Sequence, residues 1–222
     1  MGSIAAEWVK KYNGSASNLR KTQKQAEGFY HTLYGIKDFI WGNDNAWDID
    51  FEEPKSGSPS TGQDSKWIDS VDIAFFSGHG TSSGVNFGRL DKDNAKAHYS
   101  EIRLGNTRLK WIAFDACQVL KYEVHENWLQ VFQGLRYILG FHTNSKDESK
   151  RGRYFAEYLN DGYLVRYAWR KACKETEKSS HKYAYLLAIG QGSDTWNDKW
   201  NPMTSKPTPL PVEEFHYIYE SC

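Results

Sequence analysis

The sequence predicts an α/β domain in which helices cover both faces of a mostly parallel central sheet. Four short apolar runs lie in the middle and second half of the chain, and each ends at a polar residue or a glycine. Helical patterns separate the later runs. Strands that are apolar along nearly their whole length are typical of parallel sheets buried on both faces.

The N-terminal part predicts a helix and then a short strand. A helix is expected over residues 18–34, where apolar residues recur near helical spacing: Leu19, Ala26, Phe29, Tyr30 and Leu33. Ser17 or Asn18 is the expected cap, and Gly35 supplies the stop. A strand is expected over residues 36–41. The Pro, Gly and Ser content of residues 52–65 predicts a surface loop and not a domain boundary.

The four apolar runs are predicted strands over residues 71–77, 109–114, 135–141 and 183–189. Helices are expected over residues 122–132, 149–159 and 162–174. The last of these carries a buried stripe at helical spacing, formed by Val165, Ala168, Trp169 and Ala172. We expect one domain over residues 1–222, with a core at about 18–190 and an irregular tail over 191–222. Residues 201–211 of that tail hold four of the six prolines.

Composition excludes several classes of function. The 222 residues include 28 Lys+Arg and 28 Asp+Glu, and phosphate binding needs uncompensated cations, so we expect no nucleic-acid partner. No apolar run approaches the 18 or so residues that span a membrane, and the first residues lack the apolar centre of a signal peptide. Three cysteines do not make a disulfide framework, which favours a cytoplasmic location. We expect no cofactor and no metal, because nucleotide-binding glycine motifs and paired Cys–His ligands are missing from the sequence.

Two polar residues follow neighbouring strands of the predicted sheet. His79 follows the first run between Gly78 and Gly80, and Cys117 follows the second. The carboxyl ends of parallel strands meet at one edge, so we expect these side chains to lie close together. A cysteine becomes a nucleophile when its thiolate is stabilised and a base lies near it. Cys117 is expected at the N-terminus of the next helix, whose dipole favours negative charge.

This pair predicts acyl transfer, in which Cys117 attacks a carbonyl carbon and His79 protonates the leaving amine. The backbone N–H groups of Gly80 and Cys117 are expected to form the oxyanion hole. The competing interpretation is a small buried cysteine and a histidine in a turn. His142 ends the third run. It is expected either to act in the site, by binding substrate or as an alternative base, or to be a structural histidine.

An apolar strand followed by SGHG, and a second followed by DAC, resemble the caspase-like (clan CD) cysteine peptidases. That group includes caspases, metacaspases, legumains, gingipains, clostripain and separases, and the resemblance covers about residues 68–141. It implies a caspase-like three-layer fold, a His79–Cys117 catalytic dyad, and an oxyanion hole formed by the Gly80 and Cys117 amides. The chain is not a caspase proper, which has Gln-Ala-Cys and a histidine about 50 residues upstream. Here Asp115 precedes Ala-Cys, and the spacing from His79 to Cys117 is 38 residues (117 − 79).

Asp115 is similar to the acid of clostripain and separase-type members, where it helps to bind a basic side chain. By that resemblance Asp115 forms the floor of a pocket for Arg or Lys, because a buried carboxylate selects a cation that pairs with it. The alternative role is a carboxylate that caps the following helix.

The sequence therefore predicts a cysteine-dependent endopeptidase that acts on a peptide or protein, with a preference for cleavage after Arg or Lys. One alternative uses the same acyl-enzyme for peptide ligation, cyclisation or another acyl transfer. A third is a catalytically silent binding or scaffold module. The sequence makes no prediction about oligomeric state.

Overall fold

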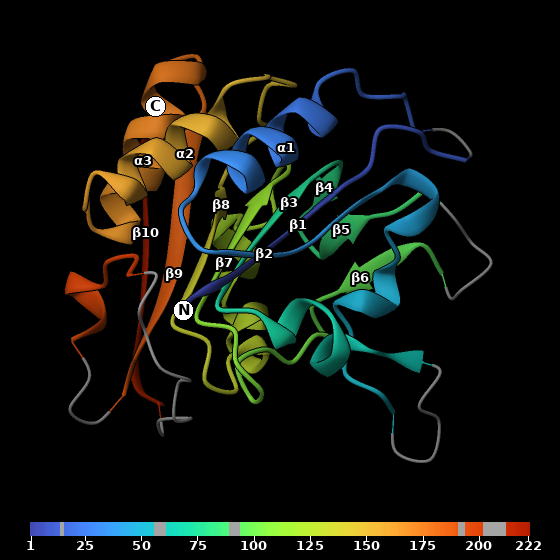
Figure 1. Ribbon diagram of the computed structural model, residues 1–222, viewed down its shortest axis with the longest axis horizontal. Coiled ribbons are helices and arrows are strands. Elements are labelled where there is room, and N and C mark those ends of the chain that lie inside the picture. The colour runs from blue at the N-terminus through green and yellow to red at the C-terminus, as the bar shows by residue number, and fades with distance from the viewer. Residues whose placement is uncertain (14–15, 56–60, 89–93, 191–193, 202–211) are drawn as a thin grey trace.

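The computed structural model describes residues 1–13, 16–55, 61–88, 94–190, 194–201 and 212–222. Its centre is a seven-stranded sheet with the order β10-β9-β8-β7-β3-β1-β2 (Figure 1). The strands are β1 (Ser3–Trp8), β2 (Ile36–Gly42), β3 (Ile73–Ser77), β7 (Trp111–Asp115), β8 (Tyr137–Phe141), β9 (Lys182–Gly190) and β10 (Val212–Ser221). The five strands from β2 to β8 in this order are parallel, whereas β9 runs antiparallel to both of its neighbours. The prediction of a mostly parallel sheet is confirmed.

Three α-helices cover one face of the sheet: α1 (Thr22–Thr32), α2 (Arg151–Asn160) and α3 (Val165–Thr176) (Figure 1). Their apolar side chains share one buried cluster with residues from β1, β3, β7, β8 and β9. Phe29 of α1 stacks on Phe75 of β3 with the ring centroids 4.9 Å apart. All four residues of the predicted stripe in α3 are buried. The 3.6-residue period therefore identified the face that packs on the sheet.

The opposite face is covered by 3₁₀ helices and a second, small sheet. The longest of these helices is η6 (Tyr122–Val131), and the small sheet has the order β4-β5-β6, with β4 (Gly80–Thr81), β5 (Gly84–Asn86) and β6 (Lys96–His98). Trp128 and Val131 of η6 are buried in this layer, because residues three apart share one face of a 3₁₀ helix. Shorter 3₁₀ helices are η1 (Asn43–Asn45), η2 (Asp48–Asp50), η4 (Asp64–Lys66) and η5 (Ile68–Ser70). Another, η7 (Thr195–Asn197), belongs to the α-helical face, where Trp196 packs against the apolar cluster. The predicted three-layer α/β arrangement is confirmed, with 3₁₀ helices on the second face.

Two predictions about the ends of the chain are wrong. The first is that the core begins near residue 18, because β1 lies inside the sheet between β3 and β2 and its residues 3–7 are buried. The second is the irregular tail, because Val212–Ser221 forms β10, which pairs with β9 along its whole length. Most of the proline-rich segment 201–211 lies outside the described residues.

The first helix also begins later than predicted, at Thr22. Asn18 does not cap it, since the Asn18 side chain accepts the backbone N–H of Tyr12 at 3.0 Å. The carboxylate of Asp147 accepts the N–H groups of Arg20 and Lys21 instead, at 2.8 and 3.0 Å. A residue over 120 positions away thus holds the two residues that precede α1, although no side chain caps the helix itself. Along the described ranges, no helix is both long enough and apolar enough to span a membrane.

Candidate active site

His79 and Cys117 line one cavity of about 210 Å³ at the carboxyl ends of β3 and β7. These two strands are neighbours, and their last residues, Ser77 and Asp115, lie opposite each other. The rest of the lining comes from the strand ends, from the start of α1 and the segment before it, and from the segment after β8: Ser77, Gly78, Asp115, Leu19, Thr22, Gln25 and residues 145–148. The strand ends therefore bring together the two residues that the sequence singled out.

Gly80 allows the segment with His79 to contact the segment with Cys117. A Cβ at Gly80 would lie 2.7 Å from the Cys117 carbonyl oxygen and 2.8 Å from the Cβ of Ala116. Only glycine fits this approach without displacing the backbone.

The backbone N–H groups of Gly80 and Cys117 lie near this contact and are available as hydrogen-bond donors. For Gly80 this follows from the pairing of β4 with β5. Because the Asn86 N–H donates to the His79 carbonyl at 2.9 Å, Gly80 and Val85 form a non-hydrogen-bonded pair. In such a pair the N–H points away from the partner strand. The Cys117 N–H donates to no acceptor within the described part of the chain. Gly80 and Cys117 thus remain the candidate oxyanion donors.

The ring of His79 is held by two residues that the sequence pattern does not assign to the site. Its Nε2 lies 2.7 Å from the carbonyl oxygen of Ser17. A carbonyl only accepts hydrogen bonds, so Nε2 carries the hydrogen and Nδ1 of the neutral ring is left as the proton acceptor. Tyr12 packs on the ring with centroids 4.6 Å apart, and its hydroxyl accepts the His79 backbone N–H at 2.7 Å. These contacts fix both the position and the tautomer of His79.

The expected helix N-terminus at Cys117 is wrong. Residues 117–120 form a turn, and the next helix begins only at Tyr122. Ser145, in the loop after β8, contacts the Cys117 sulfur instead. Its backbone N–H donates to the sulfur at 3.3 Å, the thiol donates to its carbonyl oxygen at 3.6 Å, and its Oγ lies 3.7 Å from the sulfur.

The residue after the nucleophile candidate has an unusual backbone conformation. Gln118 has a φ of 57°, a region that residues other than glycine rarely occupy. Its N–H donates to the Thr143 carbonyl at 2.9 Å, and its side-chain amide donates to Asn144 at 2.8 Å. The segment after β8 thus stabilises a sharp turn, and backbone conformations of this kind cluster at functional sites.

Asp115 has neither of its two predicted roles. Its carboxylate forms a buried ion pair with Arg151 of α2. It also accepts hydrogen bonds from Gln25 Nε2 at 2.6 Å and from Ser77 Oγ at 3.4 Å. Burial raises the pKa of Asp115 to about 6, and the Arg151 guanidinium opposes that rise. The carboxylate is already paired, so it is neither an open acceptor for an incoming cation nor a helix cap.

Arg151 itself is completely buried and has a second acidic partner, Glu177. Its Nε donates to Thr176 Oγ1 at 2.9 Å, and its guanidinium lies over the Phe141 ring, 4.8 Å from the centroid. The Asp115–Arg151 pair is therefore anchored in a polar network between α2, the C-terminal end of α3 and the sheet.

His142 does not line the cavity, contrary to the prediction of a substrate contact. Its Nδ1 accepts the backbone N–H of Tyr122 at 3.0 Å, and its ring stacks on Tyr219 at 4.5 Å. Burial and nearby Lys182 lower the pKa of His142. Its position at a strand end is as predicted, but its side chain packs toward β10.

The other two cysteines differ from Cys117. Cys173 is buried in α3, and burial raises its pKa well above the ordinary value. Burial also raises the pKa of Cys222 to about 11. Both are therefore protonated and poorly nucleophilic at neutral pH. Across the ranges that the structure describes, no three His, Cys, Asp or Glu side chains gather as a candidate metal site.

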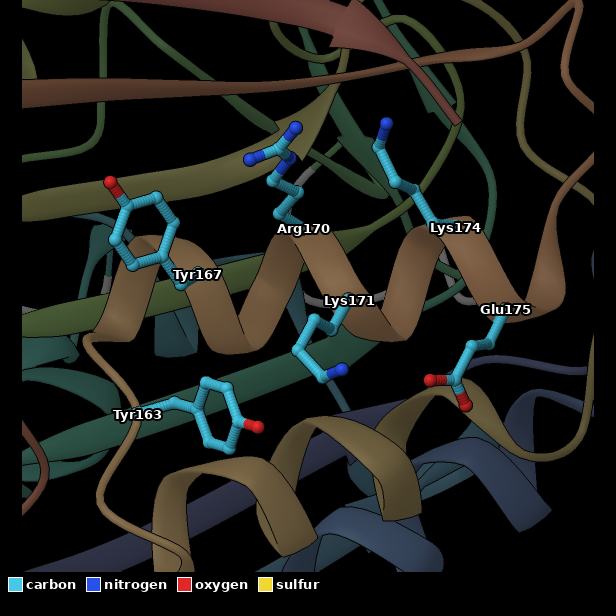
Figure 2. Close-up of a pocket in the computed structure, with 6 residues that line it drawn as sticks. All are labelled: Tyr163, Tyr167, Arg170, Lys171, Lys174 and Glu175. Carbon is cyan, nitrogen blue, oxygen red and sulfur yellow. The ribbon is translucent and has the colours of Figure 1, made fainter.

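A second hollow, of about 450 Å³, lies on the outer side of α3 (Figure 2). Its lining consists of Tyr163, Tyr167, Arg170, Lys171, Lys174 and Glu175. One of its cations, Lys171, lies over the Tyr163 ring with Nζ 5.4 Å from the centroid. Cysteine, serine and histidine are missing from this lining, so the hollow has no Cys–His or Ser–His pair like that of His79 and Cys117.

Comparisons with known proteins give one family and a structural similarity. A family model described as "Domain of unknown function (DUF6345)" matches residues 6–220. No curated protein matches the sequence. Among solved structures, the chain is similar to a secreted C11 cysteine protease from Bacteroides thetaiotaomicron, determined in complex with an irreversible peptide inhibitor. The identity is 9%, the TM-score is 0.45, and the alignment covers 84% of this chain and 66% of that one. Because the family model covers nearly the whole chain, the protein belongs to the DUF6345 family.

Proposed function

We propose that the protein is a cysteine-dependent peptidase that forms an acyl-enzyme on Cys117 with His79 as its acid–base partner. The observation that carries this proposal is the cavity that His79 and Cys117 share, each two residues beyond the end of one of two adjacent parallel strands. The contact between Gly80 and the Cys117 peptide supports it further. Active sites of open α/β sheets lie at this edge.

The proposed reaction begins with transfer of the Cys117 thiol proton to His79 Nδ1, the nitrogen that Ser17 leaves free. The sulfur attacks the carbonyl carbon of the substrate, and the resulting oxyanion accepts hydrogen bonds from the N–H groups of Cys117 and Gly80. The bond from carbon to nitrogen breaks as His79 returns its proton to the leaving amine. Water then attacks the thioester, which releases the acid and restores the thiol. The Ser145 N–H, 3.3 Å from the sulfur, stabilises the thiolate.

A preference for cleavage after Arg or Lys has no support in the geometry of the cavity. That preference requires an accessible carboxylate, and the Asp115 carboxylate is paired with Arg151 inside the protein. Ligation and cyclisation use the same acyl-enzyme, and they differ from hydrolysis only in whether an amine or water accepts the acyl group. The products formed with and without an added amine separate them.

Alkylation by iodoacetamide, followed for each cysteine by mass spectrometry, tests the proposed function. At pH 7 we expect Cys117 to react at least tenfold faster than Cys173 and Cys222, whose raised pKa values keep them protonated. His79→Ala is expected to remove this advantage. His142→Ala is the matched control, because His142 also follows a strand of this edge but lies outside the cavity. Equal, slow alkylation of all three cysteines would favour the scaffold alternative.

A further inference from the structure

We propose that the cavity beside Cys117 binds an uncharged, hydrogen-bonding side chain, a hydroxyl or a carboxamide, on the acyl side of the bond that is cleaved. This inference rests on the proposed function and adds a substrate class to it. Three features carry it: the pairing of the charged groups in the lining, an unpartnered hydroxyl, and the size of the cavity.

All three carboxylates in the lining are already paired within the chain. Asp115 pairs with Arg151, and Asp147 accepts the N–H groups of Arg20 and Lys21, which precede α1. Glu148 accepts the Ser149 N–H and lies 3.6 Å from Lys146 Nζ. An arginine or lysine side chain of a substrate therefore meets no uncompensated carboxylate, because Arg151 already balances the charge of Asp115. An acidic side chain is disfavoured as well, because Lys146 is already paired with Glu148.

Arg151 neutralises Asp115 without filling the space. Arg151 is fully buried, and it is not among the residues that line the cavity. The cation thus approaches Asp115 from outside the cavity, and the cavity side of the site stays open. Its volume of about 210 Å³ is below the roughly 300–1,000 Å³ of pockets for drug-sized ligands, which suits one amino-acid side chain.

The lining presents neutral polar groups. Gln25 and Ser77 are each 1% exposed, and both donate to the Asp115 carboxylate, which fixes their orientation. Gln25 Oε1 also accepts the Gly152 N–H at 2.9 Å, so the amide is held at both ends.

Thr22 is the group without a partner. It is 3% exposed, it lines the cavity, and its hydroxyl makes no hydrogen bond within the described residues. A buried hydroxyl is normally paired, since leaving it unpaired costs stability. A hydroxyl or carboxamide that enters the cavity supplies the missing hydrogen bond.

The test uses acyloxymethyl ketones that share one peptide and carry Thr, Asn, Ala, Arg or Asp at the residue bearing the reactive carbonyl. The rate of Cys117 labelling is measured on the full chain. We expect the Thr or Asn probe to react at least tenfold faster than the Arg and Asp probes.

Thr22→Val keeps the shape of the side chain and removes the hydroxyl. We expect it to reduce the ratio of the Thr-probe rate to the Ala-probe rate by roughly three- to tenfold, the effect of one net hydrogen bond. Using a ratio removes any general change in Cys117 reactivity. Thr32→Val, at the other end of α1 and outside the cavity, is the matched control and leaves the ratio unchanged.

Failure of this inference is distinguishable from failure of the proposed function. Slow iodoacetamide alkylation of Cys117 that does not depend on His79 would refute both. If Cys117 is activated but the Arg or Asp probe reacts fastest, the function stands and the neutral substrate class is refuted. The side-chain site is also refuted if Cys117 is activated but labels at the same rate with every probe. It is refuted as well if Thr22→Val leaves the ratio of the Thr-probe rate to the Ala-probe rate unchanged.

Discussion

Replacing Arg151 with Met removes the one cation that pairs with Asp115 among the residues described. Methionine retains most of the length of the side chain while the charge is lost. Asp115, which is 5% exposed, then keeps only its neutral donors, Gln25 and Ser77. Removing one partner of a buried ion pair typically costs about 3–5 kcal/mol, because it leaves an uncompensated buried charge. That is a large part of the roughly 5–15 kcal/mol by which domains are stable.

The loss of unfolding free energy in Arg151→Met is expected to increase with pH. The folded pKa of Asp115 is about 6, above the value of about 3.9 for an unfolded aspartate. A carboxyl whose pKa is raised by folding contributes most to stability at low pH, and the contribution declines as pH rises through the folded pKa. Arg151→Met removes the group that lowers this pKa, so the pKa of Asp115 rises further. The destabilisation therefore grows by about 1.4 kcal/mol per pH unit between pH 6 and the pKa of the variant.

Urea unfolding, followed by the fluorescence of the nine tryptophans, measures this effect at pH 5.5, 7 and 8. Arg153→Met on the same helix is the control, since its pair with Glu157 is exposed, with side-chain exposures of 47% and 41%. We expect the control to cost less than about 0.5 kcal/mol at every pH. A loss below about 1 kcal/mol for Arg151→Met, or one that does not change with pH, would show that Asp115 does not depend on this cation.

Three further substitutions test other contacts. Gly80→Ala places a Cβ 2.7 Å from the Cys117 carbonyl oxygen, so we expect it to slow alkylation of Cys117 by iodoacetamide at least tenfold; an unchanged rate would mean that the contact is unimportant. Tyr12→Phe removes the hydroxyl that accepts the His79 N–H, and we expect a loss of about 0.5–1.5 kcal/mol in urea unfolding together with slower alkylation; full stability would contradict the role of this bond. Glu7 is fully buried, and burial and Asp50 raise its pKa well above the ordinary value, so stability falls as pH rises above the unfolded pKa. Glu7→Gln is therefore expected to reduce the difference in stability between pH 5 and pH 8, and a larger difference would contradict it.

The strand ends were predictable from the sequence because each apolar run stops at a polar residue or a glycine. The strands β3, β7 and β8 each begin two residues later than predicted, but their ends fall within one residue of the prediction. For that reason the positions of His79 and Cys117 followed from the pattern alone.

The support around these two residues was not predictable, because it comes from distant segments. Ser17 and Tyr12 precede the first predicted helix, and only the fold brings them to His79. Arg151 lies between Lys150 and Arg153 in a stretch that resembles a charged helix surface. Nothing in a single sequence indicates that Arg151 points inward while Arg153 is exposed. Asp115 was misinterpreted for the same reason, since its role depends on Arg151.

The strands at the two ends of the chain were missed for a different reason. The first strand, β1, has small residues and an acid at Glu7, so it lacks the apolar run that marks β3 or β7. The last strand, β10, is a half-exposed edge in which aromatic and acidic residues mix. A strand in the centre of a sheet is selected for side chains of a size that fits as well as for apolar ones, so it can consist of small residues. An edge strand accepts both apolar and charged side chains.

The central place of β1 has a consequence for how the chain acquires its fold. The first strand finds one neighbour nearby, β2, through the crossover helix α1, which makes a local β–α–β unit. Its other neighbour begins only at Ile73, and the bonds between Ser3 and Asp72 close a loop of 69 positions. A parallel sheet folds slowly because the chain loses the entropy of closing such long loops before the strand contacts that compensate for it have formed. One edge of the first strand therefore has no partner until more than seventy residues have been synthesised, whereas β10 is added last, at the periphery.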